Sequence, residues 1–176
     1  MVRLAANTIE PSAFLPPVQI DRDIAPVGEP LKQAFVYWCG LRGTRTMPSR
    51  GEIDPRAMCR FLPHIALIDV RTVDGVPDYF VRLAGSRIEE VFGARTGRML
   101  CADIPPAIAA RWRMPCDMVR ESGMPMRTVS RIAFENKTWL EGESLHAPLG
   151  PGDIPTTIFF AFTAIGGKVP PRILNG

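Results

Sequence analysis

The order of strand-like and helix-like segments is the feature that most constrains how this chain can fold. Five runs are rich in β-branched, aromatic and other apolar residues: 64–70, 79–83, 126–134, 138–149 and 156–164. The first two are joined by the hairpin signal Asp74-Gly75, and segments with helical features lie between the second and third. This order indicates an α+β fold, a five-stranded antiparallel sheet with helices on one face.

Two helices are expected between the second and third strands. Ser86 and Glu89 have the S-x-x-E spacing of a capping box, which predicts a short helix from Ser86 to Phe92. A longer helix begins at Pro105-Pro106 and ends at Gly123, because proline suits a first helical turn and glycine suits the residue after a helix. A further short helix is expected from Asp54-Pro55 to Leu62, before the first strand.

An amphipathic helix is expected at the entrance to the domain, because Leu31, Phe35 and Trp38 follow Pro30 at helical spacing. Two of the strand-like runs are apolar on nearly every residue, so both of their faces need cover. One helix of about three turns would leave part of the second face bare. We therefore expect a homodimer with Leu31, Phe35 and Trp38 at its interface. The alternative is that this helix folds back over its own sheet in a monomer.

The two ends of the chain have a composition typical of flexible tails. Residues 1–29 carry four prolines and no sustained apolar period, and residues 166–176 contain Gly166-Gly167 and Pro170-Pro171. The expected folded unit is therefore residues 30–165, a single domain that includes the entry helix.

Charge and cysteine content narrow the function classes for this chain of 176 residues. The net charge is only +3 and the basic residues are scattered, which argues against a nucleic-acid partner.

The sequence lacks a signal peptide and an apolar stretch of about 20 residues, so we expect no membrane contact and a cytoplasmic location. The four cysteines lie far apart without a C-x-x-C pair, which favours buried free thiols over a metal site. Lysines make up only three of the 21 basic residues, a bias typical of GC-rich bacterial genomes.

A set of short motifs runs through the chain. They are Tyr37-Trp38 with Leu41-Arg42-Gly43, Met47-Pro48-Ser49-Arg50, Ile53-Asp54-Pro55, Leu62-Pro63-His64, the segment YFVRLAG at 79–85, Phe92-Gly93 and Thr96-Gly97-Arg98. Over roughly residues 33–165 this combination resembles a family of small, stand-alone bacterial PAS proteins. The resemblance implies a five-stranded antiparallel sheet whose helices enclose a pocket. It also implies a sensory or regulatory module that works by binding, with signalling proteins such as a histidine kinase as partners.

Five residues are candidates for lining such a pocket: Arg82, Phe92, Trp112, Phe160 and Phe162. The aromatic residues could equally belong to the core. Arg82 could hold an acidic ligand, but a salt bridge with Asp69 across the hairpin is the favoured interpretation. The expected ligand is a small apolar or acidic molecule of unknown identity.

Haem and flavin are not expected as cofactors. PAS proteins that bind haem usually ligate iron with a histidine on the long helix, and residues 105–122 contain none. His64 and His146 are interpreted as structural, hydrogen-bonded histidines. The flavin-binding members carry a cysteine with nearby Asn and Gln. Cys59 lies before the first strand instead of between strands two and three, and Cys101 has no such neighbours.

Two other functions remain open. The sequence contains no string typical of a nucleotide-binding, metalloprotease or serine-hydrolase site. A small isomerase or hydratase could still be built on such a pocket, and its mark would be an isolated buried Asp or Glu with a raised pKa. The third hypothesis is a protein-interaction module with a filled core and no ligand.

Overall fold

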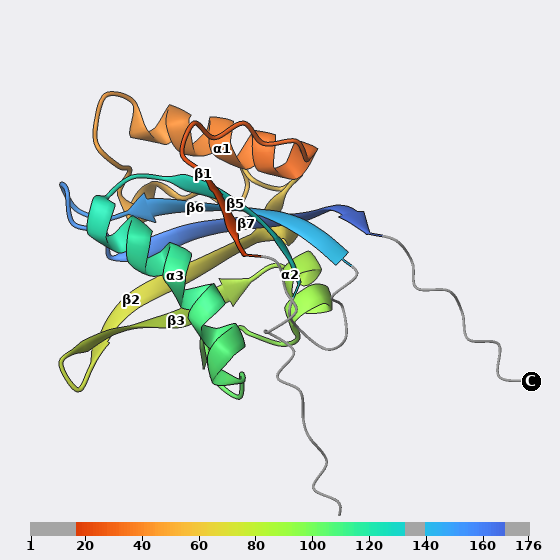
Figure 1. The fold of residues 1–176 in the computed structure, drawn as a ribbon. Coiled ribbons are helices and arrows are strands. Elements are labelled where there is room, and N and C mark those ends of the chain that lie inside the picture. Colours follow the sequence, from red (N-terminus) through yellow and green to blue (C-terminus); the bar gives the residue numbers. More distant parts are fainter. Residues whose placement is uncertain (1–16, 133–139, 168–176) are drawn as a thin grey trace, which may run out of the picture.

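A computed structural model describes residues 17–132 and 140–167 of the chain as a single antiparallel sheet with helices on both faces (Figure 1). The strands, in sequence order, are β1 (Gln19–Asp21), β2 (Ile65–Val73), β3 (Val76–Ala84), β4 (Arg98–Met99), β5 (Met126–Arg131), β6 (Leu140–Leu149) and β7 (Thr157–Gly167). Their order across the sheet is β1-β5-β6-β7-β2-β3-β4. The predicted α+β fold is confirmed. The five expected strands form the centre, and the short strands β1 and β4 add one more at each edge.

The helices lie on opposite faces of the sheet. They are α1 (Glu29–Arg42), α2 (Ser86–Phe92) and α3 (Pro106–Ser122), with short 3-10 helices at Arg50–Glu52 and Leu62–His64. Alternate residues of β6 and β7 point to opposite faces, as they must in a strand. Leu145 and Phe159 pack under α1, whereas Ile158 and Phe162 pack on the side of α2 and α3. The chain therefore has two hydrophobic layers separated by one sheet.

Helix α1 covers its own sheet, so the expected dimer interface is wrong for Leu31 and Trp38. Both side chains are 0% exposed, and the Trp38 Nε1–H donates to the carbonyl oxygen of Pro148 at 3.0 Å. Phe35 is half-buried and its ring is stacked with that of Trp38. The apolar strands did need cover on their second face. The helix of the same chain supplies it, with Met47, Met58 and Phe61 beside it.

Residues 17–29 belong to the folded unit, which corrects the expected boundary at residue 29. Strand β1 pairs with β5, in the register Gln19 with Val129. The backbone N–H groups of Val27 and Gly28 donate to the buried carboxylate of Glu143, at 3.1 and 2.5 Å. At the other end, Gly166-Gly167 still belongs to β7. The remaining residues of both expected tails, and the expected turn at 135–137, lie outside the described residues.

The capping box expected at Ser86 is wrong, and the same motif forms at Ser49 instead. Gly85 is the N-cap residue of α2 without a side-chain cap, and the Glu89 carboxylate accepts from the backbone N–H and hydroxyl of Thr96. In the 3-10 helix at 50–52, the Ser49 hydroxyl accepts from the Gly51 N–H and the Glu52 carboxylate accepts from the Ser49 N–H. The helix expected over 54–62 is a series of turns that leads into the 3-10 helix at 62–64.

These two serines give a direct stability test. Ser49→Ala should lower the free energy of unfolding by about 0.5–1 kcal/mol, because it removes one side of a reciprocal cap. Ser86→Ala should leave it unchanged, since this hydroxyl caps no backbone group of α2. Chemical denaturation of both variants beside the wild type measures the difference. A larger loss for Ser86→Ala than for Ser49→Ala would contradict this assignment of the caps.

Candidate ligand-binding cavity

A cavity lies between the sheet and the helices α2 and α3. Its apolar wall comes from β2, β3, β7, both helices and the residue after β4. The residues are Ala66, Ile68, Val81, Ile88, Phe92, Leu100, Trp112, Pro115, Cys116 and Phe160. The cavity volume is about 90 Å³. This is several times the about 10–15 Å³ that one water needs, so the cavity can admit a small molecule.

Three of the predicted pocket residues line this cavity: Phe92, Trp112 and Phe160. The Phe92 ring meets Trp112 edge-on at 5.4 Å and Phe162 at 5.0 Å between centroids. Phe162 is buried behind Phe92 and is not part of the lining, so it belongs to the core. An aromatic cage of this kind holds its rings in fixed edge-to-face contacts, which gives a bound molecule a rigid apolar surface.

Arg82 lies outside the cavity and forms the salt bridge that was favoured for it. Its side chain is 49% exposed, and its Nη2 lies 2.5 Å from Oδ2 of Asp69, the partner across the β2–β3 hairpin. The Nε–H donates to the same oxygen at 2.7 Å. The interpretation of Arg82 as a ligand-holding residue in the pocket is therefore wrong.

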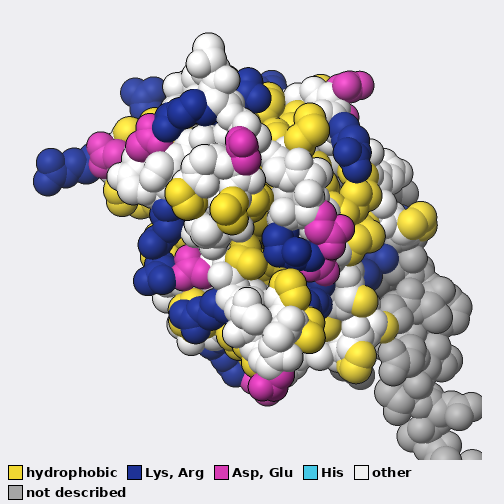
Figure 2. All heavy atoms as spheres, turned by 90° about the vertical axis from the view of Figure 1, so that its left-hand side faces the viewer, with side chains coloured by type: hydrophobic (Ala, Val, Ile, Leu, Met, Phe, Trp, Pro, Cys, Tyr) yellow, Lys and Arg dark blue, Asp and Glu magenta, His cyan; other side chains and the backbone are white. Residues whose placement is uncertain are grey.

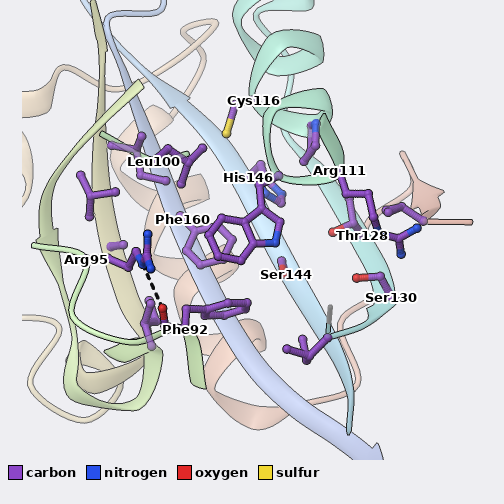
Figure 3. A pocket seen from close by; sticks show the side chains of 18 of the residues that line it. Phe92, Arg95, Leu100, Arg111, Cys116, Thr128, Ser130, Ser144, His146 and Phe160 are labelled. Carbon is purple, nitrogen blue, oxygen red and sulfur yellow. Dashed lines mark hydrogen bonds between the residues drawn. The ribbon is translucent and has the colours of Figure 1, made fainter. Parts of the chain in front are cut away.

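The opposite wall of the cavity is polar and consists of four side chains on β5 and β6. Thr128 and Ser144 are direct cross-strand partners in the sheet register. Ser130 and His146 each lie two positions further along their strands, and residues two apart share a face. All four line the cavity, and Figure 3 shows Thr128, Ser130, Ser144 and His146 on the same side of it. Sequence reasoning missed this wall because three of its members are small hydroxyl residues, whose inward direction depends on the strand register.

His146 is the buried polar residue of the cavity whose hydrogen bonding is incomplete. It is 5% exposed, its ring packs against Phe160 at 5.0 Å, and its Nδ1 has no hydrogen-bond partner among the described residues. Burial lowers the pKa of His146 to about 3, so the ring is neutral at physiological pH. The expectation of a hydrogen-bonded structural histidine is wrong at this nitrogen. It is confirmed for His64, whose Nδ1 lies 2.9 Å from the carbonyl oxygen of Phe162.

Three arginines that the sequence analysis did not single out also line the cavity: Arg95, Arg111 and Arg131. Arg95 is 7% exposed, and it donates from Nε to the carbonyl of Phe92 at 2.9 Å and from Nη1 to that of Ala102 at 3.0 Å. Arg111 projects from α3, and burial lowers the pKa of its guanidinium. In Figure 3, Arg111 lies on the side of Thr128, and Arg95 lies across the cavity.

The cavity lining contains no Asp or Glu among the described residues. The mark expected of an isomerase or hydratase, an isolated carboxyl group in the pocket, is therefore not found in this part of the chain. Cys116 lines the cavity, and burial raises the pKa of its thiol well above the usual range, so it is unreactive there. Within residues 17–132 and 140–167, no cluster of His, Cys, Asp and Glu could hold a metal ion.

The outer surface carries mixed charge. Figure 2 shows Lys and Arg side chains interspersed with acidic and apolar ones over the face in view. Several exposed arginines are paired with carboxylates, including Arg45 with Glu52 and Arg87 with Glu90. In the described residues, no helix is both long and apolar enough to cross a lipid bilayer.

Comparison with known proteins places a family model over most of the chain. Residues 28–159 match a model described as PAS domain. This span begins just before α1 and extends into β7, so it includes helices on both faces of the sheet and most of the residues that line the cavity. The family expected from the sequence motifs is thereby confirmed. No curated protein and no solved structure matches the chain at a significant level.

Proposed function

We propose that this chain, which belongs to the PAS domain family, is a non-catalytic sensory module that acts in bacterial signal transduction by binding a small molecule in its cavity. The observation that carries this proposal is the buried Nδ1 of His146. An unpartnered polar atom inside a protein costs about 1–3 kcal/mol, and a bound molecule with a matching group would recover that energy. The lining has the usual composition of a ligand site, a mostly apolar surface with a few convergent polar groups.

The position of the cavity supports a role in signalling. Val18, next to the edge strand β1, lies in the lining, and β5 both lines the cavity and pairs with β1. A bound molecule would therefore contact the N-terminal segment of the folded unit and the strand that holds it. The output of binding would be a shift of β1 relative to β5, because ligands act by favouring one of two arrangements of such an element.

Partners and compartment are part of the same proposal. We propose a homodimer and a signalling protein such as a histidine kinase as partner, in the bacterial cytoplasm, where the four free cysteines stay reduced. With Leu31 and Trp38 buried, the surface available on α1 is its outer side, where Val36 is 71% exposed. Light scattering coupled to size exclusion, with Val36→Asp beside the wild type, tests whether this side mediates association.

The ligand itself is tested by native mass spectrometry of protein purified from its own host. We expect an added mass of a small molecule that disappears on denaturation. Ala66→Met, which places a larger side chain in the cavity wall, should lose this mass and stay folded. Ala110→Met, at an exposed position of α3 outside the lining, should retain it.

Protein that carries no small molecule would contradict the proposal when a second measurement agrees. A bare-chain mass, together with no response of cavity residues in NMR spectra when small organic molecules are added, would refute ligand binding. It would favour the alternative of an interaction module that works without a ligand.

A further inference from the structure

The polar groups that line the cavity share one chemical property: each can donate a hydrogen bond. They are the hydroxyls of Thr128, Ser130 and Ser144, the imidazole of His146, the indole of Trp112 and the guanidinium groups of Arg95, Arg111 and Arg131. Asp, Glu, Asn and Gln are all absent from the lining, as far as the described residues define it. The described lining therefore has no carboxylate that could form an ion pair with an ammonium group of a ligand. An ionised carboxylate, which only accepts hydrogen bonds, matches such a wall.

The charge of the lining has the sign that a carboxylate needs. Its ionised side chains in the described ranges are all arginines, since His146 is neutral. Arg111 stands on α3 near the hydroxyl wall of β5, as Figure 3 shows. A partly buried guanidinium is stabilised by an anion more strongly than an exposed one, because less water screens the pair. With five N–H donors, Arg111 can keep contacts with the protein and still donate to a ligand.

His146 supplies an independent reason to expect a ligand at this wall. It is more than nine-tenths buried, it lies two residues from Ser144 on the same face of β6, and its Nδ1 is unpartnered in the described structure. In the tautomer with a proton on Nδ1, the ring donates one hydrogen bond. Together with Ser144 and Thr128 it forms a group of donors that lies on two paired strands.

We propose that the molecule bound in this cavity is a small organic acid, with one carboxylate held at Arg111 and the hydroxyl wall and an apolar body packed against Phe92, Trp112 and Phe160. This inference rests on the proposed function, because it names the class of ligand for the same cavity. The cavity volume of about 90 Å³ favours a small molecule. Short aliphatic acids and one-ring aromatic acids are small members of this class.

Benzoate and benzamide are suitable probes because they are matched in size and shape and differ in charge. Calorimetric titration of the purified full chain at pH 7 should show benzoate binding at least about ten-fold more tightly than benzamide, since hydrogen bonds to an ionised acceptor are about twice as strong as neutral ones. Arg111→Gln should abolish this preference. Arg113→Gln removes the same charge from the same helix, where the residue pairs with Asp78 outside the lining, and should retain it.

Three results would overturn the inference: benzamide binding as tightly as benzoate, no benzoate binding at tens of millimolar, or a preference for benzoate that survives in Arg111→Gln. Circular dichroism of each variant confirms that it is folded before titration. The proposed function is judged separately by the mass carried by protein from its host. An uncharged molecule found there would refute the acid and leave the sensory role standing. A bare chain whose cavity residues also give no NMR response to small organic molecules would refute both.

Discussion

Replacement of Glu143 by glutamine is expected to lower the free energy of unfolding by about 3–5 kcal/mol, the usual cost of breaking a buried ion pair from one side. The Glu143 side chain is 0% exposed. Its carboxylate accepts from Nε and Nη2 of Arg127, both at 2.7 Å, and from the backbone N–H groups of Val27 and Gly28. Glutamine has the same size, but its amide nitrogen cannot accept a hydrogen bond, so it would leave donors unsatisfied in a buried site.

The matched control is Glu90→Gln. Glu90 forms an ion pair with Arg87 on the surface of α2, where both side chains are more than half exposed. Such pairs contribute about 0–1 kcal/mol, so this variant should unfold close to the wild-type midpoint. Urea denaturation of the three proteins measures the difference.

Hydrogen exchange locates the effect of Glu143→Gln. The amides of β1 and of residues 27 and 28 should lose protection first, because the Glu143 carboxylate joins them to the sheet. A stability loss below about 1 kcal/mol would show that the pair with Arg127 is not maintained in solution.

The strands could be predicted from the sequence because their signals are local. Asp74 and Gly75 both have positive φ, 50° and 78°, as a two-residue hairpin requires, and these two residue types adopt that conformation readily. The run of β-branched and aromatic residues in β7 and the glycine after α3 are equally local signals. Gly123 ends α3 in the left-handed conformation, as its position predicts.

The N-terminal segment could not be predicted because its order depends on a distant residue. Strand β1 has only three residues and no apolar pattern. Gly28 is held by Glu143, 115 positions later in the chain. Composition therefore indicated a tail where tertiary contacts produce a strand.

The choice between two S-x-x-E motifs also depended on tertiary packing. At the start of α2, the backbone of Gly85 packs so closely that an added Cβ would lie 2.4 Å from the carbonyl oxygen of Pro63. This contact places glycine at the N-cap and Ser86 inside the helix. In the cavity, the aromatic lining residues could be predicted from their residue type. The hydroxyl residues could not, because the side of the sheet that they face depends on the pairing of Thr128 with Ser144.

The stability of the protein should decrease by about 2 kcal/mol between pH 7 and pH 5 through His146 alone. Burial lowers the pKa of His146 from 6.5 to about 3 in the folded state. In the unfolded chain this histidine binds a proton below about pH 6.5, and the folded protein does not accept it until about pH 3. The unfolded state therefore binds more protons in this window. The contribution to stability is complete above pH 6.5 and is lost progressively as the pH falls.

His146→Leu should remove this pH dependence, because leucine fills a similar volume without a titratable group. At pH 7 the variant should be as stable as the wild type or more so, since it also removes the unpartnered Nδ1. A variant of the only other histidine, His64→Gln, leaves His146 in place and should keep the wild-type slope. Thermal and urea unfolding at pH 5, 6 and 7 compare the three proteins, above the range in which carboxylates titrate. Equal slopes for wild type and His146→Leu would mean that the buried imidazole becomes protonated in the folded protein, which would require a hydrogen-bond acceptor within reach of its ring.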